Sequence, residues 1–456
     1  MHGLLSLFCA LLLALPASAT QRKARKKRPP KPRQVERPIP EPRAPVSPLT
    51  DEIQPPAEFP PTLERDRSGE PWPIRLMMGD IKGGMLVRIP VIDTDPNRGI
   101  TYGVMPIWVY KENGGNRIRT IHAPSLTYNR IFKLIPTYRY YLYPDDLSAL
   151  NFRASISFKD DKELLGAFED VDFLDRGWAL GWKAQFNVDG SERFFGMGPD
   201  SVRAKEANYT SHTIQHFIRL GLPIFKGSGW KFNLSHHIAG VRLTDGPVDA
   251  LPDLKLDFPT HAPQHYHQDA EMQLFMDYDT RDSAVTTTRG AYSKIFVENA
   301  QRELGSEFSF QRYGFEQKHF MPHGADSRFV TGVHARYEQL VGNAPFYLQP
   351  SLGGKYIHRA YGTGRYIDRG LAVMNIEERI TVWKIPVAGV VTEYEFAPFM
   401  GLGTVFDTPG RMASRYARPV YGASVRAIAR PQVVGSIDFG VGQEGLAVFM
   451  DINYPF

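Results

Sequence analysis

Apolar and polar residues alternate with a period of two along several segments of the chain. The segments 151–159, 178–188, 230–238 and 448–456 each place aliphatic and aromatic side chains on one face and mostly polar or small side chains on the other. Strict alternation over about 9–11 residues is typical of a tilted strand that crosses a membrane. Strands of sandwiches and propellers alternate too, but they usually have about 5–6 residues. Aromatic residues such as Trp108, Tyr110 and Tyr138 gather toward segment ends, which favours the membrane barrel.

The region from residue 85 to residue 456 therefore predicts an all-β fold, a closed antiparallel transmembrane β-barrel. In hydrocarbon every backbone N–H and C=O must be paired within the protein, and a set of strands achieves this only by closing on itself. At roughly 20–25 residues per strand and connection, the region predicts about 16 strands. The segments 292–301 and 308–320 alternate poorly, and 160–172, which has some helical character, is predicted to be a loop.

The first 73 residues differ from the rest in composition. Residues 4–15 form a short apolar run, and Ala17, Ser18 and Ala19 follow it, which predicts a signal peptide over 1–19. Residues 20–73 are rich in proline and carry an early basic cluster, which predicts a disordered basic Pro-rich linker. The transmembrane β-barrel domain is expected over 74–456. An exported barrel of this kind predicts location in the outer membrane of a Gram-negative cell.

The net charge of +5 originates in the linker. Between residues 21 and 43, ten Lys or Arg residues stand against Glu36 and Glu41, a local charge of +8, so the rest of the chain carries about −3. The basic tail gives no reason to expect a nucleic-acid partner for the folded part. The single cysteine, Cys9, lies in the predicted signal peptide, so the mature chain lacks thiolate chemistry.

Motifs that carry enzyme or cofactor chemistry do not occur in a suitable context. Residues 440–445 match GxGxxG, but a strand is expected to follow, which indicates a tight hairpin and not a dinucleotide site. The histidine and aspartate residues of one Pro-rich loop do not have the spacing of a common zinc site: Asp257, His261, His265, His267 and Asp269. We therefore predict no catalytic residue, no metal ion and no cofactor, and that the protein is not an enzyme.

Several short motifs follow one another in an order found in one family of barrels. Asp279, Arg281 and Asp282, followed by Gly290, are similar to its DxRD…PxxG signature, with Thr287 in place of the proline. The segments 194–200, 357–361, 375–379 and 399–403 are similar to its FYGxGN, V-R-G-[FY], N-x-E-x-R and F-x-D-x-G motifs. On these motifs, residues 85–456 resemble the BamA/TamA-like bacterial surface antigen family of outer-membrane β-barrels, as a barrel-only member lacking POTRA repeats.

The resemblance implies roles for particular residues. In that family a loop folds back into the barrel, and its arginine pairs with acidic groups on the wall. Arg359 is the matching cation here, with Tyr361 beside it and Glu378 as the candidate partner, whereas Gly401 replaces the family's aspartate. Because a buried guanidinium without a partner is costly, we predict that Arg359 pairs with a glutamate on a neighbouring strand.

The last alternating residues, Ile452, Tyr454 and Phe456, predict a carboxy-terminal signal for barrel insertion. The partners implied are outer-membrane lipid, the barrel-assembly machinery during biogenesis, and client outer-membrane proteins or lipids. The resemblance implies a role in assembly or translocation, through insertion or transport of protein or lipid. The alternatives are a small-solute pore, a surface antigen without assembly activity, and an outer-membrane enzyme such as a lipid hydrolase, for which the sequence shows no nucleophile–base pair.

Overall fold

The computed structural model describes residues 78–112, 118–145, 147–225, 228–262, 265–283, 286–324, 328–387, 390–429, 433–451 and 454–456. The predicted signal peptide (1–19), the predicted linker (20–73) and residues 74–77 lie outside the described residues. Among the described residues, none of the helices has the length and apolar character needed to cross a membrane.

Strands form nearly all of the regular structure. The first half of the chain contains β1 (Met78–Ile81), β2 (Gly84–Asp95), β3 (Gly99–Lys111), β4 (Ile118–His122), β5 (Ser125–Asn129), β6 (Lys133–Leu142), β7 (Ser148–Ile156), β8 (Asp161–Phe173), β9 (Trp178–Phe194), β10 (Ala207–Pro223) and β11 (Trp230–Asp245). The second half contains β12 (His267–Asp279), β13 (Gly290–Ala300), β14 (Ser309–His323), β15 (Phe329–Asn343), β16 (Ser351–Leu352), β17 (Tyr366–Ile367), β18 (Gly370–Val387), β19 (Val390–Phe406), β20 (Arg418–Ala429), β21 (Val433–Gly442) and β22 (Gly445–Asp451).

Helical turns are confined to the connections between strands. They are α3 (Leu254–Asp257) and the 3-10 turns η1 (Arg203–Lys205), η2 (Pro259–His261), η3 (Arg302–Leu304), η5 (Phe346–Leu348), η6 (Pro409–Arg411) and η7 (Ser414–Tyr416). All of them lie at the end of the sheet that carries the longer connections. The short β21–β22 turn at 443–444, on the same end, contains no helical turn.

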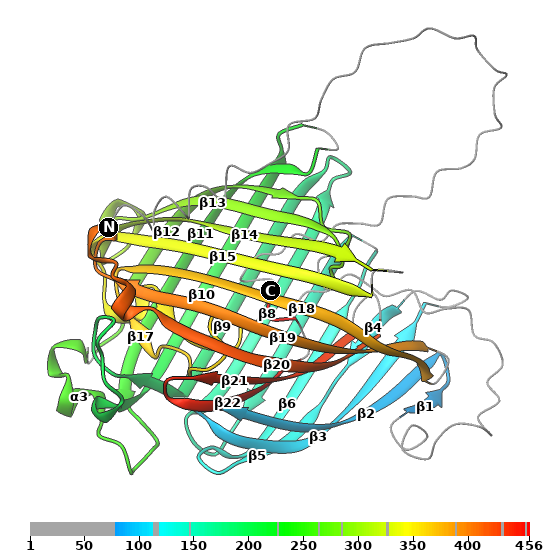
Figure 1. Ribbon diagram of the computed structural model, residues 1–456, viewed down its shortest axis with the longest axis horizontal. Helices are drawn as coiled ribbons and strands as arrows, with labels where there is room; N and C mark the ends of the chain where they lie inside the picture. Colours follow the sequence, from blue (N-terminus) through cyan, green and yellow to red (C-terminus); the bar gives the residue numbers. More distant parts are fainter. Residues whose placement is uncertain are drawn as a thin grey trace, which may run out of the picture. The chain divides into compact units, whose positions relative to one another are not determined.

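Each strand pairs antiparallel with its chain neighbours, so one sheet follows the chain from β1 to β22 (Figure 1). β16 and β17 form a separate ribbon inside the β15–β18 connection, and β15 pairs directly with β18. Of the 20 strands in the sheet, β4 and β5 share one position between β3 and β6, and the four-residue β1 pairs antiparallel with only the first residues of β2, 84–87. The described residues thus provide 18 positions around the wall.

The predicted all-β antiparallel fold is confirmed, with two more strand positions than the estimate of about 16. One source of the difference is the segment 160–172, because it was predicted to be a loop and forms β8 instead. Its inward positions hold small and charged residues such as Ala167 and Glu169, which hide the alternation from a hydropathy reading. The alternating segments 178–188 and 230–238 lie within β9 and β11, whereas 448–456 leaves the sheet after Asp451.

Burial in the wall is the reverse of burial in a soluble protein. On β10, Ile214 and Ile218 are 55% and 43% exposed, whereas Arg219, on the opposite face, is 2% exposed. Among the largest fully buried side chains are three arginines, Arg219, Arg379 and Arg426. Apolar residues face outward to hydrocarbon, and charged residues face inward, as expected for a strand with lipid on one side.

The sheet brings its last strand, β22, beside β2 (Figure 1). Thr94 Oγ1 on β2 donates a hydrogen bond to the backbone oxygen of Val448 on β22. Within the described residues no backbone ladder joins β2 and β22, although every other neighbouring pair has one. We call this junction the seam.

A charge on the outer face should destabilise the barrel far more than the same charge on the inner face. Ile214→Arg, near the middle of β10, places a guanidinium in hydrocarbon, and we expect a loss of about 2–4 kcal/mol in the free energy of unfolding. The matched control is Gln215→Arg, one residue along on the polar inner face, where the loss should be below about 1 kcal/mol. Urea unfolding in lipid bilayers measures both, and equal losses would contradict the assignment of faces.

Candidate functional site

Residues 353–369, here called the inner loop, lie in the β15–β18 connection and fold back against the inward face of β18–β21. Arg359 is 2% exposed. Its Nη1 is 3.1 Å from Glu377 Oε2 on β18 and 3.2 Å from Asp438 Oδ1 on β21. Its guanidinium also lies 3.7 Å from the centre of the Phe399 ring on β19. Its Nη1 also donates to Ser424 Oγ on β20 at 3.4 Å, so four successive strands of the wall, β18 to β21, contact this single side chain.

Glu377 lies at the centre of a buried cluster of charges. Besides Arg359, it accepts hydrogen bonds from Arg379 Nε at 2.6 Å and from Arg426 Nη2 at 2.9 Å. Arg426 Nη1 in turn lies 2.8 Å from Glu395 Oε1 on β19. We call these side chains the lock cluster: Arg359, Glu377, Arg379, Glu395, Arg426 and Asp438. Three positive and three negative charges balance, which is what makes their burial tolerable.

The acidic partners of Arg359 differ from the sequence candidate. Glu378 points to the opposite face of β18, where Thr331 Oγ1 donates to its Oε2 at 2.7 Å and His323 Nε2 lies 2.9 Å from its Oε1. Because strand side chains alternate, Glu377 and not Glu378 shares the inward face. Gly401 carries no acid, as predicted, and Asp438 supplies the second negative charge from β21 instead. The alternation of side chains within 375–379 could have identified Glu377 as the inward-facing glutamate.

The GxGxxG segment forms the β21–β22 hairpin, as predicted, and it also receives the inner loop. Gly442 pairs with Gly445 across the turn. A Cβ atom on Gly440 would lie 1.6 Å from the backbone oxygen of Arg359, so only glycine lets the loop approach β21 this closely. The backbone N–H of Gln443 donates to the Tyr361 hydroxyl at 3.1 Å. Tyr361 thus holds the loop to the hairpin.

His358 is buried beside Arg359 and is held as a neutral side chain. Its Nε2 donates to the backbone oxygen of Arg418 at 2.9 Å, and its ring stacks on Tyr361 with centres 5.5 Å apart. Burial, opposed only in part by the Arg418 hydrogen bond, lowers the pKa of His358 to about 4. The seated loop therefore disfavours protonation of this histidine.

The inner loop contacts the hairpin turns on both sides of the seam. Arg365 Nε donates to both carboxylate oxygens of Glu444, in the β21–β22 turn, at 2.7 and 2.9 Å. Arg365 Nη1 also donates to Ser201 Oγ at 3.1 Å, close to the 194–200 motif. On the other side, Asn97 Nδ2, in the β2–β3 turn, donates to the backbone oxygen of Thr363 at 2.9 Å. The loop thus links two hairpins that no ladder joins.

The DxRD segment shapes the β12–β13 connection. Arg281 Nη2 lies 2.7 Å from Asp279 Oδ2, and Asp282 Oδ1 accepts from the backbone N–H of Thr288 at 2.9 Å. Gly290 has φ +102°, and a Cβ there would lie 2.2 Å from the backbone oxygen of Thr280. The four motif residues Asp279, Arg281, Asp282 and Gly290 therefore build a turn.

Arg379 joins three separate parts of the chain. Besides Glu377, it donates to the backbone oxygen of Thr287 in the DxRD turn at 3.0 Å and to that of Phe456 at 2.9 Å. Sequence reasoning did not single it out as a functional residue. Its place two residues after Glu377, on the same face of an alternating segment, is the signal that could have found it.

The final residues turn inward instead of continuing β22. Phe456 packs against Phe320 and Val330, and the Tyr454 hydroxyl donates to Glu395 Oε2 at 3.1 Å. Ile452 lies outside the described residues. In the folded barrel, Tyr454 and Phe456 therefore contact the lock cluster and do not face lipid, and their role as an insertion signal stays a prediction for the unfolded chain.

The residues weighed as a metal site do not stay together. The His261 ring packs on Phe194, with centres 5.3 Å apart, and Asp269 Oδ1 accepts from Ser306 Oγ at 3.1 Å. Asp257 ends α3. His265 and His267 remain close to each other, and Glu307 from the β13–β14 connection joins them.

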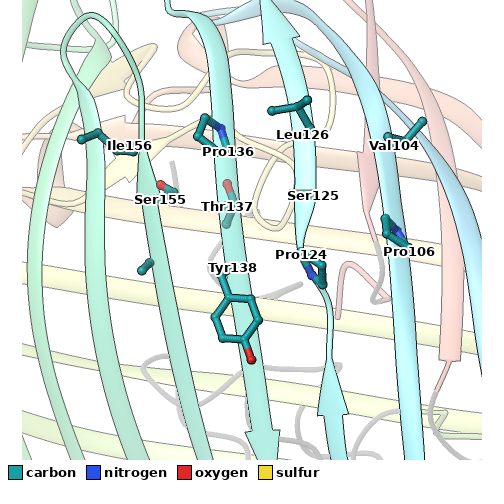
Figure 2. Close-up of a pocket in the computed structure, with 11 residues that line it drawn as sticks. Val104, Pro106, Pro124, Ser125, Leu126, Pro136, Thr137, Tyr138, Ser155 and Ile156 are labelled. Atoms are coloured by element: carbon teal, nitrogen blue, oxygen red, sulfur yellow. The ribbon is translucent and has the colours of Figure 1, made fainter.

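A hollow of about 610 Å³ lies on the outer face of β3, β5, β6 and β7 (Figure 2). Pro124 separates β4 from β5 because it cannot donate to the ladder. Exposed Val104, Leu126 and Ile156 surround the hollow, and Tyr138 is the one titratable side chain among its lining residues. Its chemistry is that of a lipid-facing surface.

A barrel with apolar outside, charged inside and a loop seated against its inner wall defines an outer-membrane β-barrel. Residues 148–442 match the family model of the Omp85 superfamily domain, and the chain belongs to that superfamily. Omp85 barrels are non-enzymatic assembly and transport proteins of the outer membrane.

The fold is similar to that of solved barrels. BamA from Haemophilus ducreyi lacking POTRA domains 1–3 is 12% identical with a TM-score of 0.50, and the match covers 80% of this chain and 74% of that chain. CdiB from Acinetobacter baumannii is 12% identical with a TM-score of 0.41, covering 80% of this chain and 59% of that one. CdiB from Escherichia coli is 10% identical with a TM-score of 0.41, covering 80% and 61%. No curated protein matches the chain in sequence.

Removal of the central carboxylate should separate the roles of two adjacent glutamates. Glu377→Gln leaves three buried guanidinium groups short of one negative charge, and we expect a loss of about 3–5 kcal/mol in stability. Glu378→Gln, on the half-buried opposite face, should cost less than about 1 kcal/mol. Urea unfolding followed by tryptophan fluorescence in detergent micelles compares them. Similar losses for both variants would mean that Glu377 does not organise the cluster.

Acid should release the inner loop through His358. The released histidine takes up a proton below its ordinary pKa of about 6.5, whereas the seated one does so only near 4, so seating weakens as the pH falls between these values. The full effect is about 3 kcal/mol. Hydrogen exchange of residues 353–369 should rise across this range, and His358→Gln should remove the His358 contribution. A pH profile that is the same in both proteins would exclude His358 as the responsive group.

Proposed function

We propose that the chain is an outer-membrane assembly or translocation protein that inserts or transports protein or lipid in a Gram-negative cell. Outer-membrane proteins or lipids are its clients, and the barrel-assembly machinery is its partner during biogenesis. Export by the predicted signal peptide over 1–19 belongs to the same proposal. Membership of the Omp85 superfamily supports it at the level of the class.

The observation that carries the proposal is the seam. Backbone groups at the facing edges of β2 and β22 lack a ladder to each other within the described residues. An unpaired strand edge in hydrocarbon is costly, and it accepts an incoming strand by backbone hydrogen bonding. A client strand, or a lipid passing between leaflet and lumen, would meet the least resistance there, because among the described residues every other pair of neighbouring strands shares a backbone ladder.

The position of the inner loop supports a gated role over the two alternatives. Contacts with Glu444 on one side and Asn97 on the other place the loop across the junction that has to open. A small-solute pore needs an unobstructed lumen, whereas Arg359 fixes the loop against the inner wall. A surface antigen without assembly activity needs no such buried cluster of charges.

A disulfide across the seam tests the proposal. The mature chain has no cysteine if the signal peptide is removed, so Thr94→Cys with Val448→Cys creates one defined pair. In a strain from which the gene is deleted, we expect the oxidised variant to leave outer-membrane proteins or lipids depleted and the reduced variant to restore them. Quantitative proteomics and lipid analysis of outer membranes provide the measurement.

The matched control is Phe439→Cys with Val448→Cys, because these two residues already face each other in the β21–β22 ladder. It should restore the membrane composition whether oxidised or reduced. Full restoration by the oxidised seam variant would overturn the role of the seam. If deletion leaves the composition unchanged, assembly activity itself is refuted, and a large current in planar bilayers would then identify a pore.

A further inference from the structure

We infer that His265, His267 and Glu307 form a binding site for a divalent transition-metal ion such as Zn²⁺ at the end of the barrel that carries the longer connections. One ligand atom from each residue lies within 4.8 Å of the other two. Imidazole nitrogen and carboxylate oxygen are the donors that Zn²⁺ accepts, with bonds of about 2.0–2.2 Å. Because His265 is exposed, a small rotation of its side chain would bring all three ligand atoms within bonding distance of one ion.

Two of the three ligands come from one element. His265 and His267 stand two residues apart where the chain enters β12, so their rings lie side by side, with centres 4.3 Å apart. Two imidazoles this close can supply two nitrogen donors to one cation. The sequence placed these two histidines together, but it did not show a third ligand, because Glu307 lies 40 residues further along the chain.

Glu307 is held in position by β12. Its backbone N–H donates to the backbone oxygen of Gln268 at 2.9 Å, and its Oε1 accepts from the backbone N–H of Gln268 at 3.0 Å. These two hydrogen bonds fix the carboxylate, and its Oε2 lies 2.8 Å from His267 Nδ1. Zn²⁺ would take the place of the proton between these two atoms.

A second group of similar composition is less suited to a metal ion. His237, Asp269 and Glu271 also bring three ligand atoms within 4.8 Å. There, however, Arg312 Nη2 lies 3.5 Å from Glu271 Oε1, and a guanidinium already supplies the positive charge. Among the described residues, the ion-pair partner of Glu307 is His267 and not an arginine or lysine, so this carboxylate can bind a metal ion.

Calorimetry with Zn²⁺ tests the site on the full-length mature protein in detergent micelles, without a polyhistidine tag and after removal of metal by EDTA. We expect one Zn²⁺ per chain. His267→Ala and Glu307→Gln should each weaken the affinity at least tenfold, and His237→Ala, in the second group, should leave it unchanged. Glu307→Gln keeps an oxygen that can accept from Gln268, so it tests the charge without removing that hydrogen bond.

A structural readout separates a specific site from scattered surface binding. Zn²⁺ joins β12 to the β13–β14 connection, so hydrogen exchange of residues 301–308 should slow on addition of Zn²⁺ in the wild type and in His237→Ala. It should not slow in His267→Ala. Wild-type affinity in both His267→Ala and Glu307→Gln, or loss of affinity only in His237→Ala, would overturn the proposal. So would exchange at 301–308 that does not respond to Zn²⁺ in the wild type.

Discussion

Hydrocarbon offers the polypeptide backbone no hydrogen-bonding partner, and this constraint determines most of the structure. It requires strands to pair with both neighbours, which is why the chain forms one continuous antiparallel sheet from β2 to β22. It also makes any interruption informative. Pro124 interrupts the β4–β5 position, and in the part of the chain that the structure describes β2 and β22 meet without a ladder. The continuous strands β3 and β6 bridge the interruption at Pro124. The junction of β2 and β22, in contrast, is where the two ends of the sheet meet.

The interior follows a different requirement, because its charges must be balanced. Glu377 receives three guanidinium groups, and Glu395 and Asp438 supply the remaining negative charge. These groups come from the inner loop and from four successive strands, β18 to β21. Through Arg379 the same cluster reaches the DxRD turn and the inward-turned end of the chain. The cluster therefore connects segments that are far apart in sequence.

The sequence predicted the class of fold well, because a period of two over ten residues has few explanations. The prediction of individual strands failed where the inward positions carry small or charged residues, as in β8. Hydropathy cannot distinguish such a strand from a polar loop. Arg359 and Tyr361 were identified by motif, but the choice of Glu378 ignored the alternation that turns it away from the loop. Asp438 and Glu307 could not be predicted, because each reaches its partner from a distant strand or connection.

The contacts of the inner loop on the two sides of the seam are unequal in strength. The bond from Asn97 to Thr363 is a single neutral hydrogen bond at an exposed position, worth about 1 kcal/mol. Arg365 and Glu444 form a forked, charge-assisted pair with the arginine 4% exposed. Separation of the junction would break the weaker contact first, so the loop would stay attached to the β21–β22 hairpin, and the β2 edge beyond the residues paired with β1 would lose its contact with the loop. The two edges of the junction are therefore unequal: the loop shields the β22 side, whereas the β2 side would be accessible, and under the proposed function this asymmetry would give a client strand one defined edge on which to begin pairing.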